Sequence, residues 1–318
     1  MLFLNKSIHL VFKFQHPVIL NDIKSGSNIL FSILKMKIIK GVFFFMLAIT
    51  FLFSCNSRQN LEKQADVRLK HIEQLINHNS LNEAKIEIDS FHMLFPRLVN
   101  KRRIAAAYSD TIVGRESSRS LAYCDSILPL EQHAADSIQK NFRYEKDKIY
   151  QETGNFIYKT QNTENNATRI YLKAYVDDNA DYYLISNYCG PKLEHTSVEV
   201  STNNLFAHTD TINTSDPDYH SFTDDGLRWE VVTFKNESGK TVSAFIAQNV
   251  SQKIKVILHG KKDYVYFLAD SDKKAIYETY NLWIVKKDIL RLQFEIKKAT
   301  AKIERITAER TTKIKKRI

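Results

Sequence analysis

Glycine, proline and cysteine are scarce in this chain of 318 residues, which contains 8 Gly, 5 Pro and 3 Cys. A collagen-like repeat needs far more glycine, a disordered Pro/Gly-rich chain needs more of both, and a small disulfide-stapled domain needs more cysteine. The chain is 43% hydrophobic and 26% charged. This composition is sufficient for one large folded domain or two small ones.

Motifs of familiar chemistry are also missing. The sequence contains no G-x-S-x-G, H-E-x-x-H, P-loop or Gly-rich nucleotide turn, and no C-x-x-C spacing for zinc or redox chemistry. We therefore expect no cofactor and no enzymatic activity. A hydrolytic alternative would require His and carboxylate side chains to converge in a cleft, and His208 and His220 are its candidates.

Residues 36 to 55 have the three-part layout of a secretory signal. They read MKIIKGVFFFMLAITFLFSC, with a basic start at Lys37 and Lys40 and an uncharged apolar run over residues 41 to 53. This run is shorter than the roughly 18 to 20 residues that a membrane-spanning helix needs. The segment is therefore interpreted as a removable signal rather than a permanent anchor.

The end of this segment, Leu52-Phe53-Ser54-Cys55, resembles the lipobox of bacterial lipoproteins, and the chain resembles lipoproteins of the Gram-negative Bacteroidota. The resemblance implies a signal peptide over residues 36–54, a diacylated Cys55 and a linker over residues 55–60. In those lipoproteins an acidic cluster after the cysteine directs the product to the cell surface. Residues 56–60 contain no acid. The resemblance thus implies a lipid-anchored protein of the bacterial cell envelope that faces the periplasm.

Two alternatives to this interpretation stay open. The first is an ordinary signal peptide, or an anchor helix with an incidental cysteine. The second concerns residues 1–35, which have no place before a signal sequence, because such signals stand at the extreme N-terminus. We interpret residues 1–35 as an upstream extension from a start codon assigned too early, and the alternative is a genuine extension.

Net charge is concentrated in two parts of the chain. Of the formal charge of +10, residues 1 to 55 contribute five net positive charges and residues 286 to 318 contribute eight, which leaves three net negative charges elsewhere. A basic C-terminal segment can bind nucleic acid or anionic lipid. Because an exported protein meets little nucleic acid, we expect no nucleic-acid partner. The alternative is a solvated helix face, and a location of the basic tail near anionic head groups is a hypothesis.

Helical spacing dominates residues 61–165. Residues 61 to 95 are predicted to form a helical hairpin, with Ser80 and Glu83 as a capping box, and residues 98 to 128 a helix that Pro129 ends. A further helix is predicted over residues 131 to 160. Its apolar residues repeat every seven positions at Ala135, Phe142, Ile149 and Phe156.

The C-terminal segment, residues 271–318, has the clearest periodicity in the chain. Its apolar residues step by four and three over three heptads, as in a coiled-coil seam. This seam consists of Val285, Ile289, Leu292, Ile296, Ala299, Ile303 and Ile306. We expect it to pack antiparallel against the helix over residues 131 to 160, and the alternative is self-association in a homo-oligomer.

Residues 166–270 change to a period of two, which is typical of strands. Eight strands are predicted, at 169–176, 180–188, 196–201, 205–211, 227–234, 241–248, 253–258 and 264–268. Residues 236–239 are expected to form a hairpin turn. The predicted fold class is therefore α+β: a helical N-terminal region, an antiparallel coiled-coil stalk with an inserted antiparallel β-sandwich or partly open barrel, and a long C-terminal helix.

Three sets of side chains are candidates for sites. Cys124 and Cys189 could pair as a disulfide in an oxidising compartment. His208, Asp210 and His220 are weak metal candidates, with a solvated loop as the favoured alternative. Tyr171, Tyr175, Tyr183 and Trp229 could stack on sugar rings, although aromatic residues also simply fill sheet cores.

These observations predict an envelope adaptor or scaffold that contacts another protein and is anchored in the membrane through lipid. A glycan- or small-ligand-binding lipoprotein that uses the aromatic side chains of the β-domain is the alternative. An exposed row of Tyr or Trp on one sheet face would favour the alternative. Buried aromatic side chains and an exposed apolar strip on the helices would favour the adaptor.

Overall fold

The computed structural model describes residues 58–149, 151–224 and 226–315. The chain divides into two compact units, one up to Ser109 and the other from Asp110, and helix α3 (Val99–Gln139) belongs to both. The predicted signal peptide and lipidation site, including Cys55, lie outside the described residues. Within the described ranges, no helix combines the length and apolar character needed to span a membrane.

The first unit contains the predicted helical hairpin. The chain is helical over residues 58–77, turns at residues 78–80, where Asn79 adopts a φ of 66°, and continues as α2 (Leu81–Leu94). The predicted apolar faces are confirmed as buried: Ala65, Leu69, Ile72 and Ile76 on the first helix, and Ala84, Ile88 and Phe91 on the second. The predicted capping box is wrong, because the Ser80 side chain makes no cap hydrogen bond.

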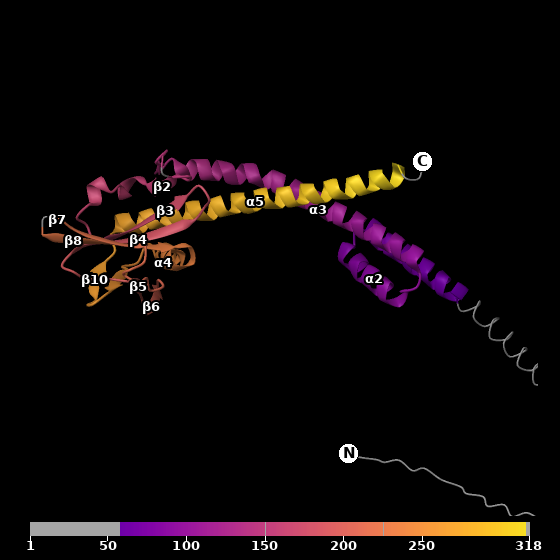
Figure 1. Cartoon of the computed structure of the whole chain (residues 1–318), viewed down its shortest axis with the longest axis horizontal. Helices are drawn as coiled ribbons and strands as arrows, with labels where there is room; N and C mark the ends of the chain where they lie inside the picture. The colour runs from indigo at the N-terminus through magenta and orange to yellow at the C-terminus, as the bar shows by residue number, and fades with distance from the viewer. Residues whose placement is uncertain (1–57, 150, 225, 316–318) are drawn as a thin grey trace, which may run out of the picture. The chain divides into compact units, whose positions relative to one another are not determined.

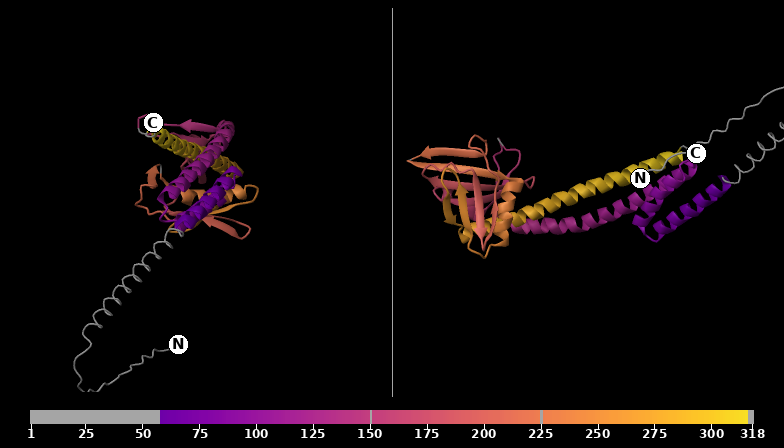
Figure 2. Two further views of the ribbon diagram at one scale, coloured as in Figure 1. Left: turned by 90° about the vertical axis from the view of Figure 1, so that its right-hand side faces the viewer. Right: turned by 90° about the horizontal axis from the view of Figure 1, so that it is seen from below.

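In the second unit, α3 from Asp110 onward lies antiparallel to α5 (Asp270–Lys315), as Figures 1 and 2 show. Arg310 donates a hydrogen bond to Thr111, and Ile306 lies beside Gly114. Pro129 does not end α3 but lies inside it, which corrects the prediction. Its side of the helix is exposed, so water can solvate the carbonyl that the proline leaves without a helical partner.

The predicted helix over residues 131 to 160 is wrong beyond Gln139, where α3 ends. Phe142 begins strand β1 (Phe142–Glu145), and Phe156 lies in β2 (Asn155–Tyr158), which pairs with it. Ile149, the third member of the predicted heptad, is 81% exposed. The seven-residue spacing was therefore coincidental from Phe142 onward, and the seam of α5 faces α3 instead.

Among the described residues, ten strands form two antiparallel sheets around the N-terminal part of α5 (Figure 1). The six-stranded sheet has the order β1-β2-β3-β4-β8-β7, and the four-stranded sheet β10-β9-β5-β6. The bounds in the six-stranded sheet are β3 Tyr171–Asp177, β4 Tyr182–Gly190, β7 Tyr219–Asp224 and β8 Leu227–Lys235. Those in the four-stranded sheet are β5 Ser197–Thr202, β6 Leu205–His208, β9 Lys255–His259 and β10 Tyr264–Phe267. Short 3-10 turns, η1 (Lys159–Gln161) and η2 (Glu164–Asn166), lead from β2 to β3.

Seven of the predicted strands are confirmed, namely β3 to β6 and β8 to β10. Strand β7 was not predicted. The strand predicted at 241–248 is wrong, because residues Asn236–Gln248 form helix α4. Val242 and Ile246 are buried one helical turn apart. Alternate apolar residues in this segment fit a strand equally well, so the periodicity was ambiguous.

One buried cluster joins both sheets, α4 and the start of α5. The inner face of the six-stranded sheet contributes Leu184 and Val232, the four-stranded sheet Val198 and Val256, and the helices Val242 and Ile276. These six side chains are fully buried. The second face of the four-stranded sheet takes no part in this cluster.

Candidate functional site

The four aromatic residues that are candidates for ligand binding do not form one exposed row. Tyr171 is buried at 2% exposure, and the Arg169 guanidinium lies 5.2 Å from the centre of its ring. Tyr175 and Tyr183 stack on each other with ring centres 4.5 Å apart. Burial raises the pKa of both Tyr175 and Tyr183 above its ordinary value.

Trp229 does not join these tyrosines: it lies in β8, where its register partners are Cys189 of β4 and Phe222 of β7. Its ring stacks on Phe222 of the edge strand β7, with centres 5.3 Å apart and planes 4° from parallel. Its indole N–H donates to the carbonyl of Ala167 over 2.7 Å. Phe222 is 54% exposed, so this pair presents an aromatic surface to solvent.

The metal and disulfide candidates are not brought together. His208 ends β6 in the four-stranded sheet, whereas His220 lies in β7 of the six-stranded sheet. Across the described part of the chain, no group of three or more His, Cys, Asp or Glu side chains is arranged to hold a metal ion. Cys124 in α3 and Cys189 in β4, the two residues of the possible disulfide, are both free thiols in this structure.

The α5 seam is turned inward over its whole length. Leu292, Ala299 and Ile306, one heptad apart, are at most 5% exposed. Val285, Ile289, Ile296 and Ile303 are half-buried between them. These side chains are occupied by packing within the chain and do not offer a free apolar strip to a partner.

A buried network that the sequence did not reveal joins Ser186, His195 and Glu230. The His195 ring lies 3.0 Å from the Ser186 hydroxyl through Nε2 and 3.1 Å from the Glu230 carboxylate through Nδ1. This is the connectivity of a hydrolytic triad. Ser186, His195 and Glu230 belong to no sequence motif, and only the fold brings the three side chains together from β4, the β4–β5 connection and β8.

Burial argues against catalysis at this network. All three side chains are fully buried at 0% exposure, so a substrate cannot reach the Ser186 oxygen. The Glu230 carboxylate instead accepts hydrogen bonds from the backbone N–H groups of Leu193, Glu194 and His195. Burial alone would raise the pKa of Glu230, but these bonds and the one from His195 outweigh it and lower the pKa to about 2. The network therefore anchors the β4–β5 connection.

The open face of the four-stranded sheet presents apolar side chains to solvent. We call it the outer sheet face and define it by two rows that cross all four strands. One row is Phe206, Ser201, Lys255 and Phe267, and the next is His208, Glu199, Ile257 and Val265. Phe206 is 65% exposed, and Val265 and Phe267 are each 53% exposed.

Positive charge borders this face. The Lys253 ammonium group lies 3.9 Å from the centre of the Phe267 ring, and Lys255 stands in the same row as both phenylalanines. A groove of about 490 Å³ lies at one end, lined by Leu205, Phe206, both lysines and the β5–β6 turn. Asn203 and Asn204 form this turn with φ of 49° and 64°, a backbone that two-residue hairpin loops favour.

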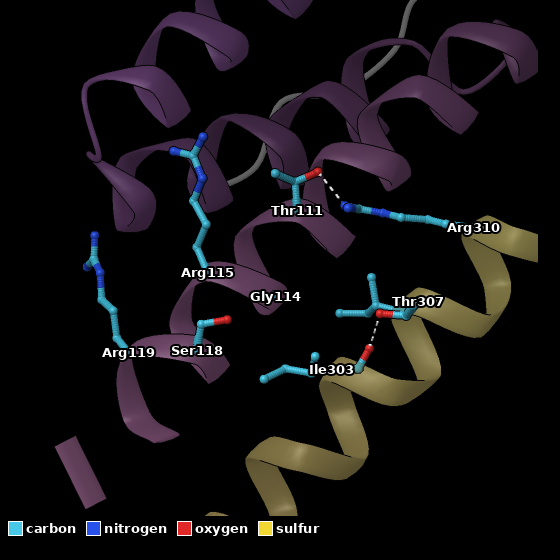
Figure 3. A pocket seen from close by; sticks show the side chains of 9 residues that line it. Thr111, Gly114, Arg115, Ser118, Arg119, Ile303, Thr307 and Arg310 are labelled. Carbon is cyan, nitrogen blue, oxygen red and sulfur yellow. Dashed lines mark hydrogen bonds between the residues drawn. The ribbon is translucent and has the colours of Figure 1, made fainter. Parts of the chain in front are cut away.

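A second groove, the helix groove, lies between α3 and α5 (Figure 3) and measures about 530 Å³. Arg115, Ser118 and Arg119 line it from α3, and Thr307 and Arg310 from α5. Arg310 donates to the Thr111 hydroxyl over 3.0 Å, across the groove.

Comparison of the chain with protein-family models, curated proteins and solved structures finds no match.

Proposed function

We propose that this protein is a non-enzymatic lipoprotein of the bacterial cell envelope that acts as a scaffold or adaptor through protein–protein contacts. Its location rests on the sequence of residues 36–55, with Cys55 as the lipidated residue and the periplasm as the compartment it faces. The observation that carries the interaction role is the outer sheet face, where three large apolar side chains are more than half exposed.

Physical chemistry supports an interaction role for this face. Contiguous apolar surface gains free energy when it leaves water, so an exposed patch with a charged border is typical of a contact surface. Aromatic side chains contribute most of the binding energy in many interfaces. Phe206 and Phe267 stand at opposite ends of one row, with Lys255 between them. A partner with apolar and acidic side chains would complement this row.

The two helices and the two sheets fit a scaffold as well. We propose that α3 and α5 form an antiparallel coiled coil, supported by the inward-facing heptad seam of α5. We propose further that the sheets form a β-sandwich supplemented by α4, since their inner faces share one buried cluster. Close packing of this kind would keep an interaction surface preorganised.

The test is crosslinking in cells of the tagged chain expressed from Met36, followed by mass spectrometry of the captured proteins. We expect one abundant envelope protein with the wild type and its loss with the double variant F206S/F267S. The matched control is F294S, because Phe294 on α5 is 63% exposed and lies outside the outer sheet face. Circular dichroism checks that each variant is folded.

Two results would contradict the proposal. Capture of the same protein by wild type and F206S/F267S would remove the outer sheet face from the contact, and capture of the chain alone would indicate a homo-oligomer. The alternative, glycan binding, is favoured by the solvent-facing stack of Phe222 and Trp229. Binding of envelope glycans that is lost in F222A, with no captured protein, would favour it.

A further inference from the structure

Strand β10 lies at one edge of the four-stranded sheet (Figure 1), and among the described residues its only strand neighbour is β9. The Leu268 N–H donates to the carbonyl of Ile254, which stands opposite it when the β9–β10 register is extended by one position. In an antiparallel pair, alternate residues turn their backbone groups toward the neighbouring strand. The N–H and C=O groups of Val265 and Phe267 therefore point away from β9. Within the described ranges, no backbone hydrogen bond outside the sheet uses them.

This edge lacks the features that usually keep other chains from pairing with an exposed strand. Such edges commonly carry a proline, a charged side chain or a bulge. Residues Tyr264–Phe267 include no proline and no charged side chain, and they pair with β9 in unbroken register. Val265 and Phe267 are each more than half exposed, so the same two residues offer unpaired backbone groups and apolar side chains. An edge of this kind can bind an extended segment as an added strand.

Two lysines beside the edge indicate the charge of such a segment. The Lys253 ammonium group lies 3.9 Å from the centre of the Phe267 ring, and Lys255 is the register partner of Phe267. Both line the groove at this end of the outer sheet face. The one carboxylate among the lining residues of this groove, Glu199, lies 3.7 Å from the His259 ring. An acidic side chain on the added segment would complement the lysines.

From these observations we infer that β10 binds an extended segment of the partner protein as a fifth strand. The segment runs antiparallel to β10, as every strand pair of this sheet does. It places apolar side chains beside Val265 and Phe267 and an acidic side chain in the row of Lys253. This inference rests on the proposed function, because it specifies how the partner contacts the outer sheet face.

The test uses the peptide Glu-Thr-Phe-Thr-Val-Thr, labelled at its C-terminus and titrated with the purified full chain while fluorescence anisotropy is recorded. In antiparallel pairing its phenylalanine stands opposite Phe267 and its valine opposite Val265, and both turn their N–H groups toward β10. N-methylation of these two residues removes the donors that face β10. N-methylation of two threonines removes the same number of donors on the other side. We expect the first change to weaken binding at least about fivefold and the second less than about twofold.

A pair of variants tests the same contact from the side of the protein. V265P removes one N–H that faces the free edge and that the ladder to β9 does not use, a position where a strand tolerates proline. V265T is the matched control, because it keeps the N–H and nearly the shape of the valine side chain. We expect V265P to bind the peptide at least about fivefold more weakly than V265T. Circular dichroism checks that both variants are folded.

Several results would overturn the inference. Equal effects of the two N-methylated peptides, or equal affinities of V265P and V265T, would show that no strand is added, and so would a wild type that does not bind the peptide. Dimerisation of the chain that V265P abolishes, without peptide binding, would assign the edge to a second copy. If F206S/F267S loses the protein captured in cells while V265P keeps it, this inference fails and the proposed function stands.

Discussion

At the scale of single residues, the buried Glu230 carboxylate makes five polar contacts. It accepts three backbone N–H groups from consecutive residues, and it contacts His195 at 3.1 Å and Arg228 at 3.2 Å. A buried carboxylate is stable only when its lone pairs are satisfied in this way. Gly260 lies so close to the same connection that an added Cβ would stand 2.5 Å from the Leu193 carbonyl. The β4–β5 connection is therefore held from both sides.

The lowered pKa of Glu230 predicts a specific dependence of stability on pH. Its pKa in the folded state is about 2, against an ordinary value of 4.5. Ionised Glu230 therefore stabilises the fold above about pH 4.5, and this stabilisation is lost as the pH falls toward 2, at a cost of about 3 kcal/mol. Chemical denaturation followed by the fluorescence of Trp229 and Trp283 measures the change in the free energy of unfolding.

The variant E230Q isolates this contribution, because its amide does not titrate. We expect its stability to fall less steeply than that of the wild type between pH 4.5 and pH 2. E237Q is the matched control, since the Glu237 side chain is 83% exposed, and it should follow the wild-type slope. Parallel pH profiles of wild type and E230Q would show that Glu230 does not contribute this stability.

At the scale of elements, two helical glycines have opposite surroundings. In α4, a Cβ on Gly239 would lie 2.4 Å from the Phe234 carbonyl oxygen and 2.9 Å from Cβ of Leu184. In α3, a Cβ on Gly114 would meet only Cδ1 of Ile306, at 3.9 Å, an ordinary contact distance. Gly239 therefore lets α4 pack directly on the six-stranded sheet, whereas Gly114 is not needed for packing.

Alanine substitutions at these glycines should change stability in opposite directions. Alanine is about 1 kcal/mol more favourable than glycine inside a helix, so we expect G114A to stabilise the fold by up to that amount. We expect G239A to destabilise it by about 1 to 2 kcal/mol, because overpacking outweighs the gain in helix propensity. Thermal and chemical denaturation compare the two, and a stabilising G239A would contradict the described packing of α4.

Elements with a single dominant periodicity could be predicted from the sequence. The α5 seam and the two apolar faces of residues 61 to 95 were predicted correctly, because several residues in each repeat the same helical spacing. Residues 131 to 160 and 241 to 248 were not, because Phe142, Phe156, Val242 and Ile246 fit two periods. Strand β7 has an exposed burial pattern and thus no apolar alternation to reveal it.

At the scale of the whole molecule, the proposed location of the protein rests on lipidation of one residue, Cys55. The proposal predicts that cells given an alkyne-labelled fatty acid attach it to the wild-type chain and not to C55S. C124S and C189S are matched controls, because they replace the other two cysteines and should keep the label. Loss of the label in C124S or C189S but not in C55S would contradict lipidation at Cys55, as would an unlabelled wild type.

Local sequence alone determined the helical hairpin, the inward seam of α5, most of the strands and the signal-like segment, because each depends on neighbouring residues in the chain. Only the tertiary structure decided which helix packs against α5 and whether residues 236–248 form a strand or a helix. It alone brought Ser186, His195 and Glu230 into contact. The same holds for the outer sheet face and the helix groove. These features depend on contacts between residues distant in sequence, where burial and hydrogen bonding select among local conformations of nearly equal free energy.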